Sequence, residues 1–212
     1  MTLAARARPT MPDFMLETRA MAAGARRVAG IDEVGRGPMA GPVTAAAVIL
    51  DPLRIPEGLR DSKILTPLRR DALARQIHEV AQVGIGHASV DEIDALNILR
   101  ASHLAMERAV SALPIAPDHL LIDGSMLPAP LAAHASAVVK GDARSLSIAA
   151  ASIVAKVCRD AVMCTLAQDC PGYGWERNAG YVTRDHKDAL ARLGVTVHHR
   201  RSFAPVRAAL QR

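Results

Sequence analysis

Aromatic residues are scarce in this chain, with two tyrosines, two phenylalanines and one tryptophan among 212 residues. Half of the residues are nevertheless hydrophobic, so the chain can bury a sizeable core. That core must be built mainly from alanine, valine, leucine and isoleucine. The length suits one domain with room for a small appendage.

Cysteine is also rare, and its spacing excludes two kinds of small protein. The three cysteines form no C-x-x-C pair, and an odd number cannot all pair in disulfides. The pattern favours neither a zinc site nor a disulfide framework and is typical of reduced thiols in a cytosol. The longest apolar runs, residues 43–50 and 148–155, are too short to cross a bilayer. We therefore expect a cytoplasmic protein without a membrane partner, and nothing in the sequence indicates more than a monomer.

Acidic charge is in the minority. Lysine and arginine together number 26 against 21 acidic residues, a formal net charge of +5. This balance fits a polyanionic partner such as nucleic acid, but it fits an ordinary basic protein equally well. The first 25 residues are rich in arginine and alanine and lack the continuous apolar segment of a secretory signal. We expect residues 1–25 to form a flexible extension ahead of one domain over residues 26–212.

The hydrophobic pattern predicts an α/β domain with a mixed sheet. Strands are expected over residues 28–31, 43–50, 83–89, 119–122 and 135–139. Helices are expected over residues 67–80, 91–112 with a break near Asn97, 145–169, from 183 or 185 to 193, and in a short piece near the C-terminus. The first two strands are close in sequence, so we expect them to pair antiparallel.

Carboxylates stand at the ends of two predicted strands. Asp32 and Glu33 follow the first strand, and Asp123 ends the fourth. Because neighbouring strand residues point to opposite faces, we expect the chain to bend here so that both acids of the pair reach one point. An acid at the carboxyl end of a buried strand is costly unless it is charge-paired or bound to a cation. Asp160 lies on an apolar face of the long predicted helix and must be either partnered or part of a site.

Three or four carboxylates without a histidine or cysteine cluster select hard cations such as Mg²⁺ or Mn²⁺. Two such ions can activate a water molecule and stabilise the leaving oxygen of a phosphodiester. Each acid also has a simpler interpretation. Asp32 and Glu33 could form a solvated strand end, Asp123 could cap a turn, and Asp160 could be an exposed helical acid.

A glycine-rich turn follows the first pair of acids. Gly35, Gly37 and Ala40 nearly match the fingerprint G-x-G-x-x-G/A, which would indicate a nucleotide-dependent oxidoreductase. That fingerprint must open a helix, whereas Pro38 and Pro42 oppose one and the next segment reads as a strand. The dinucleotide interpretation is therefore disfavoured, although the same backbone could present N–H groups to a phosphate or sugar.

Three of the five aromatic residues, Tyr173, Trp175 and Tyr181, lie within nine residues of one another. Rings beside arginines suit contact with sugars or bases, as in a nucleic-acid-binding module without catalysis. For Tyr173 and Trp175, however, packing of a small C-terminal core is the favoured interpretation. The basic run His198–Arg201 fits either a phosphate-contacting edge or a solvated surface.

The ordered motifs of the chain resemble the type 2 ribonuclease H family, and in particular its bacterial ribonuclease HII members. The first and most specific motif is D-E-V-G-R-G at residues 32–37. The others are D-S-K at 61–63, I-D-G at 122–124, K-G-D at 140–142, A-A-A-S-I-V-A-K-V-x-R-D at 149–160, G-Y-x-T at 180–183 and H-H-R-R-S-F-x-P-V at 198–206. The resemblance covers roughly residues 26–210.

The resemblance implies a ribonuclease H-like fold with a helical, substrate-contacting part over about residues 171–212. It implies an endoribonuclease that cuts the RNA strand of RNA–DNA hybrids and cuts 5′ to single ribonucleotides in duplex DNA. Catalysis would use two Mn²⁺ or Mg²⁺ ions and leave 3′-hydroxyl and 5′-phosphate ends, as required in ribonucleotide excision repair and DNA replication. We find no glutamine-initiated, aromatic-ended tail of the kind some relatives use, so binding to a sliding clamp is not expected.

The resemblance also assigns residues. Four positions correspond to the metal-binding catalytic carboxylates: Asp32, Glu33, Asp123 and Asp160. Five positions correspond to substrate contacts: Gly35, Arg36, Gly37, Lys63 and Tyr181. The G-R-G element would contact the ribonucleotide 2′-hydroxyl and adjacent phosphate through its backbone, the lysine would lie near the phosphates, and the tyrosine would stack on the next deoxyribose.

Overall fold

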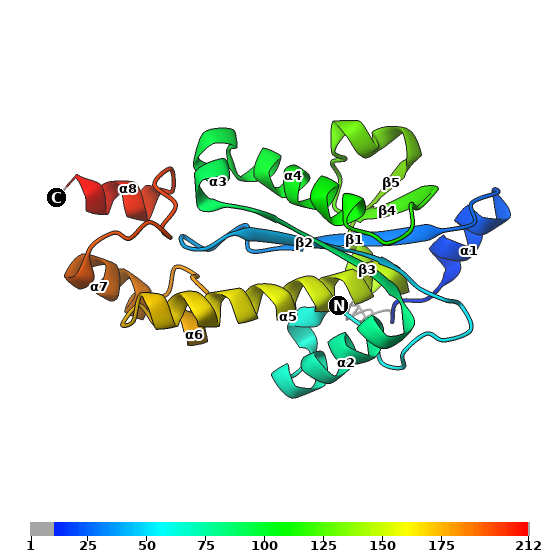
Figure 1. Ribbon diagram of the computed structural model, residues 1–212, viewed down its shortest axis with the longest axis horizontal. Coiled ribbons are helices and arrows are strands. Elements are labelled where there is room, and N and C mark those ends of the chain that lie inside the picture. The colour runs from blue at the N-terminus through cyan, green and yellow to red at the C-terminus, as the bar shows by residue number, and fades with distance from the viewer. Residues whose placement is uncertain (1–10, 212) are drawn as a thin grey trace, which may run out of the picture.

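The computed structural model describes residues 11–211, which form a five-stranded mixed sheet with helices on both faces (Figure 1). The strands are β1 (Val28–Val34), β2 (Val43–Ile49), β3 (Gln82–Ala88), β4 (His119–Asp123) and β5 (Ala135–Val138). Their order in the sheet is β3-β2-β1-β4-β5. β1 pairs antiparallel with β2 and parallel with β4, so the predicted mixed sheet and the predicted antiparallel first pair are confirmed.

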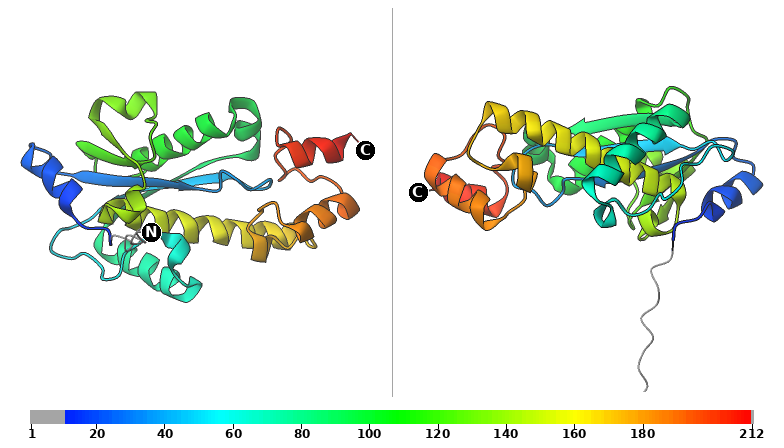
Figure 2. Two further views of the ribbon diagram at one scale, coloured as in Figure 1. Left: turned by 180° about the vertical axis from the view of Figure 1, so that it is seen from behind. Right: turned by 90° about the horizontal axis from the view of Figure 1, so that it is seen from below.

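Helices cover the sheet in two layers (Figures 1 and 2). α3 (Val90–Leu96) and α4 (Ile98–Ser111) pack on one face, while α2 (Pro67–Val80) and α5 (Leu146–Asp169) pack on the other. All seven residues of β2 are buried because both faces of this strand are covered. α5 crosses β1 so closely that a Cβ atom on Gly30 would lie 2.1 Å from the carbonyl carbon of Ser147, so only glycine fits.

The remaining elements lie at the ends of the sheet. α1 (Met15–Ala22) lies at one end, and α6 (Trp175–Asn178), α7 (Arg184–Leu193) and α8 (Ala204–Leu210) form a helical C-terminal part beyond the other (Figure 2). Short 3₁₀ turns occur at Ser62–Ile64, Ala129–His134 and Gly141–Ala143. In the C-terminal part Tyr173 and Trp175 are buried and stacked with ring centroids 5.0 Å apart, which confirms the predicted small core. No helix among residues 11–211 has the length and apolar character needed to span a membrane.

Side-chain caps begin several helices where the sequence predicts them. The Thr66 hydroxyl accepts a hydrogen bond from the Arg69 amide at the start of α2, directly before Pro67. Thr183, rather than Asp185, caps α7. The predicted break near Asn97 is confirmed, because this residue has a φ of 70° and caps α4 with its side chain.

Two expectations about the N-terminal half are wrong. Residues 15–22 of the expected loose extension form α1, which packs Leu16, Ala20 and Met21 against the core; residues 1–10 lie outside the described part. The chain also does not bend at Asp32 and Glu33. β1 runs on to Val34, since both residues keep their antiparallel partners in β2, and the turn comes only at the glycines.

Glu92→Ala is expected to lower the free energy of unfolding by about 1 kcal/mol at neutral pH. Glu92 completes a capping box with Ser89 and accepts two hydrogen bonds from Arg108. These contacts, the Arg108 hydrogen bond first, lower the pKa of Glu92 from 4.5 to about 2. A lowered acid pKa stabilises the fold above the unfolded-state value, and this part is lost as the pH falls toward the folded-state value. In thermal unfolding, the difference in Tm between wild type and variant should therefore become smaller as the pH is lowered from 6 to 3.

Candidate active site

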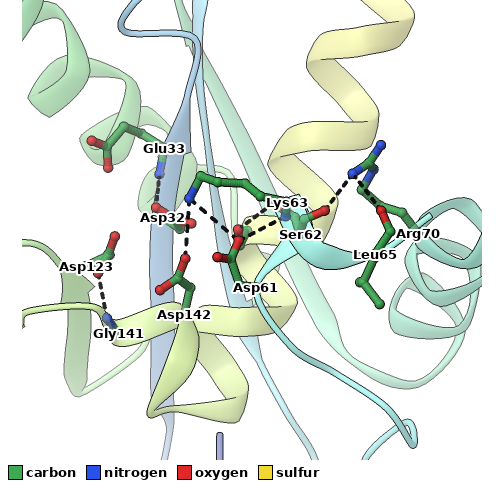
Figure 3. A network of polar contacts seen from close by, with 11 residues as sticks. Asp32, Glu33, Asp61, Ser62, Lys63, Leu65, Arg70, Asp123, Gly141 and Asp142 are labelled. Carbon is green, nitrogen blue, oxygen red and sulfur yellow. Dashed lines mark hydrogen bonds and ion pairs between the residues drawn. The ribbon is translucent and has the colours of Figure 1, made fainter. Parts of the chain in front are cut away.

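Four carboxylates gather at the carboxyl ends of β1 and β4. Because these strands are parallel and Ile31 lies opposite Ile122, the next residues, Asp32 and Asp123, come to the same edge. Glu33 follows in β1, and Asp142 approaches from the Gly141–Ala143 turn (Figure 3). The Gly141 amide donates a hydrogen bond of 2.7 Å to Asp123 Oδ1, which ties this turn to the end of β4.

The pKa shifts of these acids show that their negative charges interact. Burial, and after it the charges of Glu33 and Asp123, hold the pKa of Asp32 well above its ordinary value, and Asp142 adds to the rise. Burial also raises the pKa of Glu33, against a hydrogen bond from Arg36. Burial and then Asp61 raise the pKa of Asp142, and Asp123 contributes further. A bound cation would stabilise the ionised forms of these crowded, buried carboxylates.

The donor set fits a hard divalent cation, since it consists of carboxylate oxygens without histidine or cysteine. Glu33 and Asp123 line one open cavity of about 180 Å³ together with Arg36. Among residues 11–211, however, no three acidic, histidine or cysteine side chains converge closely enough to hold one ion. The Asp123 carboxylate faces the Gly141 amide and the Glu33 carboxylate faces Arg36 at 3.1 Å, so side-chain rotation would accompany binding.

The structure does not bring Asp160 to this group, contrary to the assignment by resemblance. Ser152 of α5 is close enough to Asp32 to lower its pKa, whereas Asp160 lies two turns further along the helix, about 12 Å at 1.5 Å per residue. Its carboxylate pairs with Lys156 Nζ at 2.7 Å, so it is the partnered helical acid of the alternative interpretation. Asp142 occupies the fourth place instead. It belongs to the K-G-D motif at residues 140–142, which is the sequence signal for this position.

The D-S-K motif faces Asp142 (Figure 3). Lys63 Nζ lies 3.4 Å from Asp142 Oδ2 and 3.6 Å from Asp61 Oδ1, on a side chain that is 75% exposed. Burial alone would lower the pKa of Lys63, but Asp61, Asp142 and Asp32 outweigh it and raise the pKa. Ser62 is buried against Ser152, with hydroxyl oxygens 2.9 Å apart. The lysine therefore stays charged and reaches the edge of the acid cluster.

Two buried arginines hold the glycine-rich loop from beneath. Arg159 donates to the carbonyls of Pro42, Ala40 and Ala179 at 2.9–3.1 Å. Arg200 donates to the carbonyls of Gly35, Arg36 and Gly41 at 2.6–3.1 Å. A Cβ atom on Gly35, which has a φ of 92°, would lie 2.1 Å from Arg159 Nε. The loop is therefore fixed largely by its carbonyls, which leaves the backbone of residues 35–37 for other contacts.

The basic run near the C-terminus is thus neither a phosphate-contacting edge nor a solvated surface at its two central residues. Arg200 is fully buried and His199 is 1% exposed. Burial and then the charge of Arg159 lower the pKa of Arg200 to about 9, so it remains positive at neutral pH. Arg200 and Arg159 together place fixed positive charge beneath the loop. The local sequence does not indicate this for Arg200, because its carbonyl partners lie more than 150 positions earlier in the chain.

Tyr181 lies beside the same loop. A Cβ atom on Gly37 would be 3.6 Å from Tyr181 Cε1, and the Met39 amide donates to the Gly180 carbonyl at 2.9 Å. The tyrosine side chain is 42% exposed, although it is surrounded by ordered backbone. An exposed ring next to a glycine offers a flat surface to a ligand. The structure thus brings together the G-R-G element and the tyrosine predicted to act with it.

A buried histidine pair supports the Tyr181 backbone. His186 Nδ1 lies 2.9 Å from the Tyr181 carbonyl, and His186 Nε2 accepts from Trp175 Nε1 at 2.9 Å. The acceptor role of Nε2 leaves the proton on Nδ1, which donates to that carbonyl. His199 Nδ1 accepts from the Thr196 amide, so its Nε2 carries the proton toward His186. Burial lowers the pKa of both histidines, that of His199 to about 4, so both stay neutral.

Comparison with known proteins identifies the family of this chain. A family model described as Ribonuclease HII matches residues 29–206. Ribonuclease HII of Ruegeria pomeroyi is 66% identical over 197 residues, covering 93% of this chain and 84% of the relative. Ribonuclease H2 from Pyrococcus horikoshii has a TM-score of 0.75 at 27% identity, over 87% of this chain and 97% of that chain. RNase HII from Archaeoglobus fulgidus, solved in complex with PCNA, has a TM-score of 0.72 at 26% identity, over 84% and 95% of the two chains.

These matches confirm the resemblance drawn from the motifs and the expected ribonuclease H-like fold. The family model spans every strand of the sheet except the first residue of β1, together with all of α2 to α7. From the family match and this level of identity, the chain belongs to the ribonuclease HII family and is a hydrolytic nuclease of the ribonuclease H type.

Proposed function

We propose that this enzyme hydrolyses the RNA strand of RNA–DNA hybrids and also cuts duplex DNA on the 5′ side of a single embedded ribonucleotide. The observation that carries the proposal is the adjacency of two features. Glu33 belongs to the cluster of four carboxylates. The carbonyl-anchored loop, with Tyr181 beside it, begins two residues after Glu33 in the chain. The first feature suits phosphodiester hydrolysis, and the second suits recognition of a sugar.

The loop residues would read the ribonucleotide. Because Arg200 holds the carbonyls of Gly35 and Arg36, the amides of residues 35–37 can face a 2′-hydroxyl and its phosphate. A side chain at either glycine would obstruct this approach. The buried guanidinium charges add attraction for the phosphate from beneath. Tyr181 would stack on the deoxyribose that follows, so that the enzyme recognises a 5′-RNA–DNA-3′ junction.

The carboxylates would hold two Mg²⁺ or Mn²⁺ ions, with Asp32 and Asp123 as principal ligands and Glu33 and Asp142 completing the set. When bound, such ions activate a water molecule and stabilise the charge on the leaving oxygen. Lys63 is charged and mostly exposed beside Asp142, which suits a contact with a phosphate of the substrate. The 2′-hydroxyl serves recognition and is not needed as the nucleophile.

End-labelled duplexes test the proposal. One substrate is an RNA–DNA hybrid, and the other is a DNA duplex with one ribonucleotide. We expect cuts in the RNA strand of the first and a single nick 5′ to the ribonucleotide of the second, with 3′-hydroxyl and 5′-phosphate ends, both abolished by a chelator. Cleavage of an all-DNA duplex at the same rate, or products with 2′,3′-cyclic phosphate ends, would overturn it.

Tyr181→Ala is expected to slow nicking at a single ribonucleotide about tenfold more than it slows cleavage of an all-RNA strand, because stacking on a sugar or base contributes about 1–3 kcal/mol. The comparison uses kcat/KM for the two substrates. Tyr181→Phe keeps the ring beside Gly37 and serves as the control. Equal losses on both substrates would show that Tyr181 does not read the junction.

A further inference from the structure

The segment ahead of the family-matched region makes ordered contacts with the turn that carries Asp142. The match begins at residue 29, whereas the contacts come from residues 13–17. The Asp13 amide donates to the Arg144 carbonyl at 3.4 Å, and the Leu146 amide donates to the Asp13 carbonyl at 3.1 Å. Asp13 thus forms a parallel β-bridge with Ser145, the residue that follows Arg144.

Glu17 of α1 makes the strongest of these contacts. It is fully buried, and its Oε1 accepts hydrogen bonds from Ser145 Oγ, Ser147 Oγ and the Ser147 amide at 2.6, 2.6 and 2.9 Å. Ser145 Oγ in turn accepts from the Ile148 amide as the N-cap of α5. A carboxylate from a separate segment therefore completes the cap of a 24-residue helix at its positive end.

The cost of burying this carboxylate is not fully offset. Glu17 Oε2 is the one buried side-chain oxygen or nitrogen in the described part of the chain that lacks a hydrogen-bond partner. A buried polar atom without a partner destabilises a fold. An exposed α1 with a neutral residue at position 17 would avoid this cost. The contact therefore points to a role beyond adding stability.

The contacts of Glu17 lead to the acid cluster in two steps. Ser145 and Arg144 donate their amides to the Gly141 carbonyl at 2.8 and 2.9 Å. The Gly141 amide donates to Asp123, and the next residue is Asp142. The turn starts at Lys140, whose φ of 55° is unfavourable for a residue with a side chain. A strained turn of this kind keeps its shape only when its surroundings hold it.

We propose that Glu17 is a positioning residue for the active site: by gripping Ser145 and Ser147, it sets the turn that places Asp142 beside Asp123. The inference rests on the proposed role of Asp142. It adds a segment outside the family match to the residues that support the active site. α1 is then part of the catalytic machinery's support and not a passive appendage.

Glu17→Ala and Glu17→Gln are compared with wild type and with Glu92→Ala, all as full-length protein well below their Tm values. Glu92→Ala is the matched control because it removes a helix-capping carboxylate that makes no contact with residues 140–147. Since displacing a catalytic group by about 1 Å can slow an enzyme about 10²-fold, Glu17→Ala should lower kcat at least about tenfold and leave KM within about twofold. Glu17→Gln keeps an acceptor oxygen and should recover most of kcat.

Amide hydrogen exchange gives a readout that does not depend on activity. In Glu17→Ala the amides of residues 140–147 should exchange at least about tenfold faster, while those of β1 stay unchanged. Glu92→Ala should change neither kcat nor this exchange by more than about twofold at a similar loss of Tm. If Glu17→Ala does not fold, Glu17→Asp replaces it, because the shorter side chain cannot reach both serines.

The inference is overturned if kcat and the exchange of residues 140–147 both stay within about twofold of wild type, or if Glu92→Ala changes them equally. Failure of the proposed function has a different signature, since the wild-type protein would then cut neither substrate. In that case the exchange comparison alone decides whether Glu17 sets the turn.

Discussion

Asp32→Asn is expected to slow cleavage on the order of 10³-fold, as removal of a group that organises charge in a transition state does. It should also make the protein more stable at neutral pH without divalent ions. The pKa of Asp32 is raised by burial and by neighbouring acids. A raised acid pKa stabilises the fold only below the unfolded-state value, and that contribution is lost as the pH rises through the folded-state value. At neutral pH, which is above the unfolded-state pKa, the acid therefore opposes folding, and asparagine removes this cost.

Thermal unfolding and cleavage of a hybrid measure the two effects on the same preparations. We expect Tm to rise by about 2–4 °C without divalent ions. Added Mn²⁺ should stabilise wild type more than the variant, because a ligand stabilises the state that binds it. Duplex binding should change little. Asp71→Asn, at an exposed position on α2, is the control for loss of one negative charge. Full activity in Asp32→Asn would refute the site.

Asp142→Asn and Asp160→Asn are expected to differ by at least about 100-fold in kcat. Asp142 acts electrostatically on Asp32 and lies within reach of Lys63, whereas Asp160 pairs with Lys156 on α5. Loss of that partly exposed pair should lower the free energy of unfolding by only about 0.3–0.5 kcal/mol. Asp160→Asn should therefore retain nearly full activity.

Single-turnover cleavage of a hybrid with saturating Mg²⁺ separates the two variants. The reverse order, with an inactive Asp160→Asn and an active Asp142→Asn, would restore the assignment made by resemblance. Equal large losses would show that α5 contributes to the site in the bound state in a way that its side-chain pairing conceals.

The sequence predicts most of the fold because the signals are local. The Thr66-Pro67 start of α2, the break at Asn97 and the apolar strands all depend on neighbouring residues. The same holds for Asp32, Glu33 and Asp123, which stand at strand ends where α/β sheets build sites. Parallel pairing of β1 and β4 then brings the three acids to one edge of the sheet.

The parts that the sequence misses depend on contacts between distant segments. Asp142 follows a strand in a turn, and contacts with distant segments, among them the hydrogen bond from Gly141 to Asp123, bring it to the site. From the sequence alone Arg200 resembles a surface cation, because its hydrogen bonds to the loop carbonyls form only in the folded chain. Glu17 lies in a segment with little amphipathic pattern, and α1 is ordered by the serines of α5. No periodicity in a single sequence reports such pairings.

Anomalous diffraction from a crystal soaked in Mn²⁺ tests the central claim most directly, because it locates the ions and their ligands without an activity assay. The account predicts manganese peaks among the carboxylates of Asp32, Glu33, Asp123 and Asp142, with the Asp160 carboxylate still paired to Lys156. Peaks ligated by Asp160, or no peak at the carboxyl ends of β1 and β4, would contradict it.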